Sequence, residues 1–169
     1  MEQEAMINTL LERYRSAFRD AHSRVLALVE DLTDEQLSWR PGSHAPSIGF
    51  HVWHLARWAD HDLSAITGRP QLWRSQGLAA AWGFPAALGE DDTGTEIGDD
   101  ASELLVLPGK AVLTGYARSA FGAVDQMLDG LKTEDLLQLS QLDLAHENRH
   151  LGMIEALRGF LDLRGTATR

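Results

Sequence analysis

The sequence predicts an all-α protein built as a bundle of four long helices, and three observations support this class. Apolar residues recur at helical spacing in four separate segments. No segment alternates apolar and polar residues with the period of a strand. Residues that typically begin or end helices stand at the ends of these segments. With 169 residues, of which 44% are hydrophobic, the chain suits one domain over residues 1–169 with a substantial core.

The first long helix is expected near the N-terminus, where one face is apolar and the other charged. Its apolar positions are Ile7, Leu10, Leu11, Tyr14, Phe18, Ala21, Val25 and Leu28. A short helix follows, because Thr33 and Gln36 have the spacing of a capping box. The turn residues Pro41 and Gly42 then end it.

The second long helix is expected over residues 48–67. Ser47 is a favourable N-cap, and Gly68 with Pro70 should end the helix. Residues 69–107 show no long periodic segment, so they are predicted to form a long connection between the second and third helices. Connections of this length in compact domains often carry function.

The third and fourth helices complete the bundle. Pro108 is expected in the first turn of the third helix, whose apolar face extends to Leu131. A short helix should cover 134–139, and the fourth helix should cover 142–164 and stop at Gly165. The fourth helix has a stripe composed of His146, His150, Met153, Leu157 and Leu161. We expect this stripe to face the bundle core.

Composition excludes several classes of protein. The chain has no cysteine, which rules out disulfides, thiolate metal sites and a cysteine nucleophile. Its net charge of -10 disfavours nucleic acid as a partner. No apolar run approaches the roughly 20 residues of a membrane-spanning helix, and the acidic N-terminus is unlike a signal peptide. We therefore expect a cytoplasmic protein without a membrane partner.

Two histidines near the C-terminus have the spacing of metal ligands. His146 and His150 stand four residues apart, which places both imidazoles on one face of a helix. Residues 146–150 (HENRH) match the HExxH pattern of zinc proteases. A protease is not favoured, because the stripe continues into apolar residues and no third ligand of that class follows. A chance pairing of two polar or core histidines is the alternative.

The second helix carries three more histidines, His51, His54 and His61. A zinc ion reaches only about 2.1 Å to nitrogen, so one position of this helix is expected to supply one ligand. Together with the C-terminal pair it would give three ligands and an open position, which is the arrangement of catalytic zinc sites. The remaining histidines, His22 and His44, are expected to have no role in the site.

Several segments resemble the DinB-like (YfiT-like) metalloenzyme superfamily. Residues 47–58 (SIGFHVWHLARW) with 71–73 (QLW) resemble its second helix, and 32–41 (LTDEQLSWRP) resemble the stretch before it. Residues 146–154 (HENRHLGMI) resemble its closing HxxxHxGxI helix. The resemblance covers nearly the whole chain. The passage from 131 to 146 is shorter than is usual in the family.

This resemblance implies a four-helix bundle with up-down-down-up topology. It also implies a divalent metal ion, zinc or alternatively nickel, bound by His54, His146 and His150. His51 and His61 are then expected to be partly exposed polar residues near the pocket. Members of known activity are commonly transferases or isomerases that use a low-molecular-weight thiol, and at least one branch resembles hydrolases.

Three neutral imidazoles would leave the metal dipositive, so it could activate either a thiol or a water. We therefore expect a metal-dependent enzyme that transfers a low-molecular-weight thiol to a small electrophile. The alternatives are a metal-dependent hydrolase and a non-catalytic metal-binding or stress-related bundle. A small molecule is the expected partner, and a homodimer is left open. Asp143 and Glu147 are either partners of the ligand imidazoles or surface carboxylates. The pocket is expected beside the 69–107 connection, with walls drawn from Trp58, Trp73 and Trp82.

Overall fold

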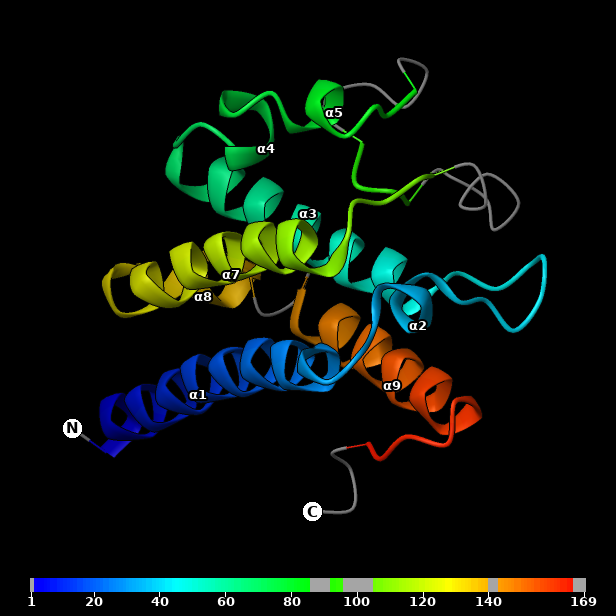
Figure 1. Cartoon of the computed structure of the whole chain (residues 1–169). Helices are drawn as coiled ribbons and strands as arrows, with labels where there is room; N and C mark the ends of the chain where they lie inside the picture. The colour runs from blue at the N-terminus through cyan, green and yellow to red at the C-terminus, as the bar shows by residue number, and fades with distance from the viewer. Residues whose placement is uncertain (1, 86–91, 96–104, 140–142, 166–169) are drawn as a thin grey trace.

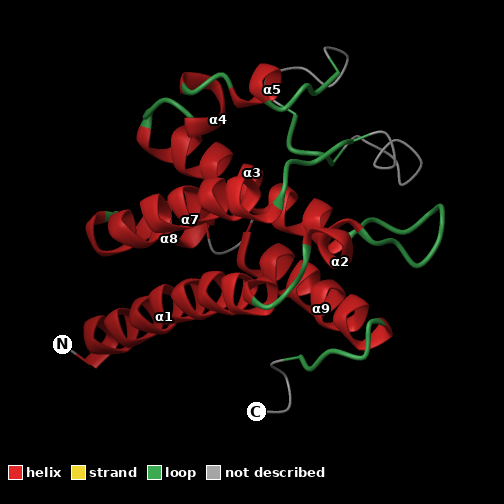
Figure 2. Cartoon of the chain, viewed as in Figure 1, coloured by secondary structure: helices red, strands yellow, loops and turns green. Residues whose placement is uncertain are grey.

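The all-α class is confirmed by the computed structural model of the chain (Figures 1 and 2). The structure describes residues 2–85, 92–95, 105–139 and 143–165, and no strand occurs in these ranges. The four long helices are α1 (Glu2–Glu30), α3 (Ile48–Thr67), α7 (Lys110–Met127) and α9 (Ala145–Phe160). The short helices are α2 (Asp34–Ser38), α4 (Leu72–Ser75), α5 (Leu78–Ala81), the 3-10 turn η2 (Leu128–Gly130) and α8 (Thr133–Leu139).

The four long helices pack together around one apolar core. Helix α3 packs most extensively against α7 and also contacts α9, while α1 contacts both α7 and α9 (Figure 1). Fully buried side chains from three of these helices meet in the core, among them Phe18, Trp53 and Phe121. The up-down-down-up order remains a prediction. None of the helices in the described ranges combines the length and the hydropathy needed to cross a bilayer.

The local signals around α2 and α3 gave correct boundaries. Thr33 and Gln36 form the capping box, with Gln36 N donating to Thr33 Oγ1 at 3.1 Å and Thr33 N donating to Gln36 Oε1 at 3.0 Å. Ser47 caps α3 by accepting from Phe50 N at 3.1 Å. Gly68 ends the helix in the left-handed conformation, with φ of 72°. The predicted range 48–67 is therefore the observed one.

The third long helix begins later than predicted. Gly109 is the N-cap and Lys110 the first helical residue, so Pro108 lies just outside the helix. The backbone N–H of Lys110 donates to Asp34 Oδ1 at 2.6 Å, and the Lys110 ammonium donates to the carbonyls of Glu30 and Leu32. These contacts with the α1–α2 region fix where α7 starts.

The fourth long helix ends earlier than predicted. The first expected residue, Leu142, lies outside the described residues, and α9 begins at Ala145. It ends at Phe160 and not at Arg164, because Asp162 adopts a positive φ of 58°. The N–H groups of Asp162 and Leu163 donate to the carbonyls of Gly159 and Arg158 at 3.1 and 2.9 Å. This is the hydrogen-bond pattern of a Schellman motif, which here uses Asp instead of Gly.

A buried polar network attaches the long connection to α3. Asp60 accepts from the backbone N–H groups of Leu72 and Trp73, both at 2.8 Å. The buried Arg57 guanidinium donates to Gln71 Oε1 at 3.1 Å and to the Asp92 carbonyl at 3.2 Å. The network therefore holds both the start of the connection and its later segment, residues 92–95, against the helix that carries His54.

Candidate metal centre

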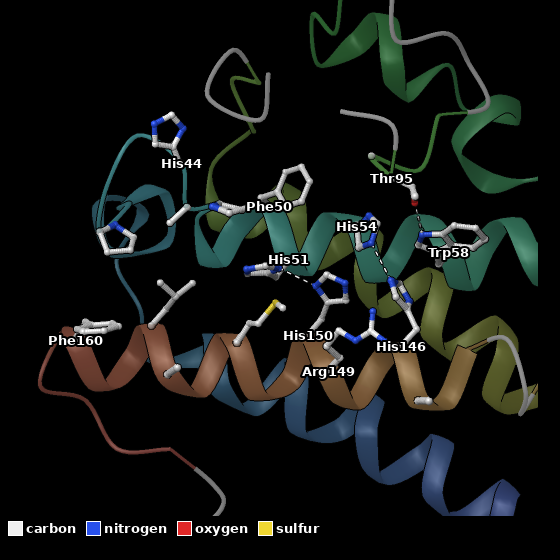
Figure 3. A pocket seen from close by; sticks show the side chains of 18 residues that line it. His44, Phe50, His51, His54, Trp58, Thr95, His146, Arg149, His150 and Phe160 are labelled. Atoms are coloured by element: carbon white, nitrogen blue, oxygen red, sulfur yellow. Dashed lines mark hydrogen bonds between the residues drawn. The ribbon is translucent and has the colours of Figure 1, made fainter. Parts of the chain in front are cut away.

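Three histidines from two helices come together in the bundle. His54 extends from α3, and His146 and His150 extend from successive turns of α9 (Figure 3). Each offers one ring nitrogen, and these nitrogens all lie within 4.8 Å of one another. The Nε2 atoms of His54 and His146 are 2.9 Å apart. These histidines, which the sequence also singled out, could therefore hold a metal ion.

The backbone fixes the tautomer of His54. Its Nδ1 lies 2.5 Å from the carbonyl oxygen of Thr93, in the connection. A carbonyl only accepts hydrogen bonds, so Nδ1 carries the proton and Nε2 presents its lone pair toward His146. Metal-binding histidines typically use their second nitrogen in this way. The sequence gave no indication of Thr93, because it is separated from His54 by 39 residues.

His51 is more closely involved than predicted. It was expected to be partly exposed, but it is buried, and its Nδ1 lies 2.9 Å from Nδ1 of His150 (Figure 3). The two rings are linked by one hydrogen bond, which leaves the second nitrogen of His150 for a metal. Because His51 stands one turn before His54 on α3, spacing alone could not show which of the two meets His146.

The two carboxylates on the N-terminal side of the ligands behave differently. Asp143 is buried, and its Oδ1 is 3.7 Å from Nδ1 of His146, close enough for a charge interaction but not for a hydrogen bond. Glu147 is also buried, but it accepts from Nε2 of His22 at 2.9 Å and contacts no ligand candidate. Of the two, only Asp143 is placed to orient a candidate ligand.

His22 lies outside the three-histidine cluster, as expected, but it is buried and holds three helices together. It is 2% exposed, stacks on Phe121 and bridges two carboxylates, with Nδ1 2.8 Å from Asp125 and Nε2 2.9 Å from Glu147. Burial opposes the charged ring, but the hydrogen bonds to both carboxylates win and raise the pKa of His22 to about 9. His22 thus links α1 to α7 and α9 as a cation. The side chain of His61 is 37% exposed and bonds to Asp62, as expected for a polar residue near the site.

The electrostatics of the cluster favour neutral imidazoles. The pKa values of His51 and His54 are each lowered to about 4, mainly by burial and in addition by a neighbouring histidine. For His54, the bond to the Thr93 carbonyl opposes this shift without overcoming it. Burial also lowers the pKa of His150, with further lowering by the other histidines. Metal ions bind imidazole in its neutral form, so the donor set and its protonation fit a divalent ion. Tetrahedral ligands about 2.1 Å from one ion lie about 3.4 Å apart, and the three nitrogens here lie within 4.8 Å of one another.

The cluster opens into a pocket of about 880 Å³. The stripe of α9 that carries both histidines was expected to face the core. Three of its members, His146, His150 and Met153, line this pocket instead, while Leu157 both lines the pocket and packs in the core, and Leu161 packs against the core without lining the pocket. Met153 is 40% and Phe160 70% exposed at the pocket. The buried face of α9 is instead formed by Glu147, Leu151, Ile154, Leu157 and Arg158.

The opposite wall of the pocket comes from α3, the 41–46 loop and residues 94–95 of the connection. Trp58 lines the pocket as predicted, and its Nε1 donates to Thr95 Oγ1 at 3.2 Å (Figure 3). Trp73 and Trp82 do not line it. They pack with each other and with Tyr116 in an aromatic cluster, at centroid distances of 5.1 to 5.8 Å. Their apolar area stabilises the core.

The fold and the site define the class: a helical bundle with three histidines that could hold a metal at the end of an open pocket. The sequence profile of the DinB superfamily matches residues 17–154, and the chain belongs to this superfamily.

Among solved structures, the chain is similar to a conserved protein of Enterococcus faecalis. The TM-score is 0.68 at 18% sequence identity, and the match covers 88% of this chain and 96% of that one. At this identity the likeness shows the fold alone. No curated protein matches the chain.

Proposed function

We propose that the chain is a metal-dependent enzyme that transfers a low-molecular-weight thiol to a small electrophile. The observation that carries the proposal is the convergence of His54, His146 and His150 at the end of a pocket of about 880 Å³. This volume is within the range of small-molecule sites, so two small reactants could meet beside the histidines. The proposal includes zinc as the ion, with nickel as the alternative.

A divalent ion bound by three neutral imidazoles keeps its full charge and an open position, where it would lower the pKa of a thiol or a water. The chain's residues would supply orientation. Thr93 holds His54 with Nε2 toward the ligand cluster, and His51 holds His150. The chain has no cysteine, so the thiol must arrive from solution. A cytoplasmic location, where thiols are kept reduced, is part of the proposal.

Hydrolysis is the second candidate, because the pocket is open and the same ligand set would activate water. A non-catalytic metal-binding or stress-related protein is the third. A homodimer is compatible with each of them. Turnover measurements on protein of known metal content separate these functions.

The first test is metal content. Protein purified without an affinity tag or chelator should contain about one divalent ion per chain by elemental analysis. Replacing His54 or His150 with Ala should abolish this binding. The matched control is His44→Ala, because His44 lines the same pocket but stands outside the three-histidine cluster. Wild-type protein that takes up no zinc or nickel would refute the metal site.

The second test is the reaction. Metal-loaded protein is mixed with a panel of small electrophiles, with and without glutathione, bacillithiol or mycothiol. Turnover that requires a thiol and disappears in His150→Ala supports transfer. Turnover without thiol would instead establish hydrolysis. A metal-loaded protein with no turnover under either condition would refute both reactions and favour the non-catalytic function.

A further inference from the structure

The pocket beside the three histidines has an unusual charge distribution for this chain. The sequence contains 25 acidic and 15 basic residues other than histidine. Yet the described residues that line the pocket include no Asp or Glu, and Arg149 is their one Lys or Arg. Among the described lining residues, a ligand with a negative charge would therefore meet a positive charge and no carboxylate.

Arg149 is available for a ligand. It lies on α9 between His146 and His150, and its side chain is exposed at the pocket (Figure 3). Within the described part of the chain, it takes part in no hydrogen bond or ion pair. Arg40, which precedes the 41–46 loop, differs: it donates to the carbonyls of Ser43 and Ala45 and so holds this loop, which forms part of the pocket wall. Arg149 has no such structural task.

The same face of α9 continues into apolar residues. Ala145, Arg149, Met153, Ala156 and Phe160 follow one another at spacings of three or four residues, and all line the pocket. From Arg149 to Phe160 this face extends about 16 Å along the helix. Both Met153 and Phe160 expose apolar surface there. The pocket thus has a cationic end beside the histidines and an apolar end, with Phe160 at the far side in Figure 3.

We propose that this pocket binds an amphipathic carboxylate: its anionic group is held by the guanidinium of Arg149, and its apolar part lies over Met153 and Phe160. A guanidinium binds a carboxylate through two parallel hydrogen bonds, which orients the ligand as well as holding it. The inference rests on the proposed function, because the carboxylate belongs either to the thiol or to the electrophile. Arg149 would position that reactant beside the histidines.

The test uses two fluorescent probes that differ only in one anionic group, 8-anilinonaphthalene-1-sulfonate and the neutral N-phenyl-1-naphthylamine. Binding is titrated on chelator-treated protein, so the result does not depend on a metal ion. Arg149→Met should weaken binding of the sulfonate roughly 3- to 10-fold, the range for a charge-assisted contact that is partly solvated. Binding of the neutral probe should not change. Arg149→Lys should keep part of the sulfonate affinity.

Two controls locate the binding. Arg118→Met removes an exposed arginine of α7 outside the pocket and should leave both probes unaffected. Phe160→Ala should weaken both probes, because it removes apolar wall. Equal sulfonate affinity in Arg149→Met and wild type would overturn the proposal. So would equal loss of both probes in Arg149→Met, or no effect of Phe160→Ala on either probe.

Displacement of the bound sulfonate identifies the source of the carboxylate. Displacement by glutathione assigns the anionic group to the thiol, and displacement by 4-phenylbutyrate assigns it to the second reactant. Either result supports the site if the competing carboxylate binds more weakly to Arg149→Met than to wild type. Displacement by neither would overturn the assignment to a carboxylate. Zinc and nickel content is measured separately. The experiments can therefore refute the metal site while supporting the anion site, or refute the anion site while supporting the metal site.

Discussion

Gly94 couples the connection to the candidate metal centre, so Gly94→Ala should weaken metal binding without altering a ligand. Gly94 has φ of 89°, and its N–H donates to Asp92 Oδ1 at 2.6 Å. An added Cβ would lie 2.6 Å from Cζ3 of Trp53 and 3.3 Å from Nδ1 of His54. Trp53 is 1% exposed and packed among other rings, so it cannot move aside.

The structure gives the size of the effect. A side chain at positive φ costs about 1–2 kcal/mol, and overpacking a filled site costs about 1–3 kcal/mol. Segment 92–95 can relieve both by moving away, but this would break the bond from His54 to the Thr93 carbonyl. Loss of such a partner typically weakens metal binding by about 10- to 100-fold. We therefore expect Gly94→Ala to weaken metal binding by this factor and to lower the free energy of unfolding by about 2 kcal/mol.

Zinc affinity is measured by competition with a chromogenic chelator, and stability by urea denaturation of the metal-free protein. The control is Gly115→Ala, at an exposed position of α7 where an added Cβ meets nothing within 4 Å. It should leave zinc affinity unchanged and raise stability by up to about 1 kcal/mol. If Gly94→Ala binds zinc within about twofold of wild type, the connection is not coupled to the metal centre through Gly94.

Two further predictions concern buried charges. The free energy of unfolding should fall as pH rises from 6.5 to 9. The pKa of His22 is raised from 6.5 to about 9 in the folded protein, so its protonated ring stabilises the fold fully below pH 6.5 and this stabilisation is lost as pH rises through 9. The loss is at most about 3 kcal/mol, and urea denaturation at pH 6.5 and 9 with an NMR titration of His22 checks it. Arg158→Met should lower the unfolding free energy by about 2 kcal/mol, because the buried guanidinium donates to the carbonyls of Leu28 and Arg164. A variant as stable as wild type in urea would contradict this role.

The parts of the fold set by neighbouring residues could be predicted from the sequence. The caps Thr33, Ser47 and Gly68 act over three or four residues, so α2 and α3 began and ended as expected. The end of α9 could not be predicted this way. A left-handed cap is usually Gly, and the apolar pattern continued past the Asp162 that provides it here.

The candidate site likewise has features that the sequence predicts and features that it does not. The spacing of His146 and His150 was visible, and the family resemblance selected His54 as their partner. Two contacts around the site were not visible, because each joins residues far apart in the chain: Thr93 accepts from His54 across 39 residues, and His22 bonds to Glu147 of α9 across 125 residues. Charged residues such as Arg57 are usually exposed, so composition gave no reason to place this one in the interior.

The contact between His22 and Glu147 has a consequence for where the functional unit begins. None of the described pocket-lining residues belongs to α1. Yet His22 of α1 holds Glu147, which lies on α9 between the two C-terminal histidines. A protein shortened from the N-terminus past His22 would keep every described residue of the pocket wall but lose this contact between α1 and α9. The superfamily match starts at residue 17 and so includes this contact.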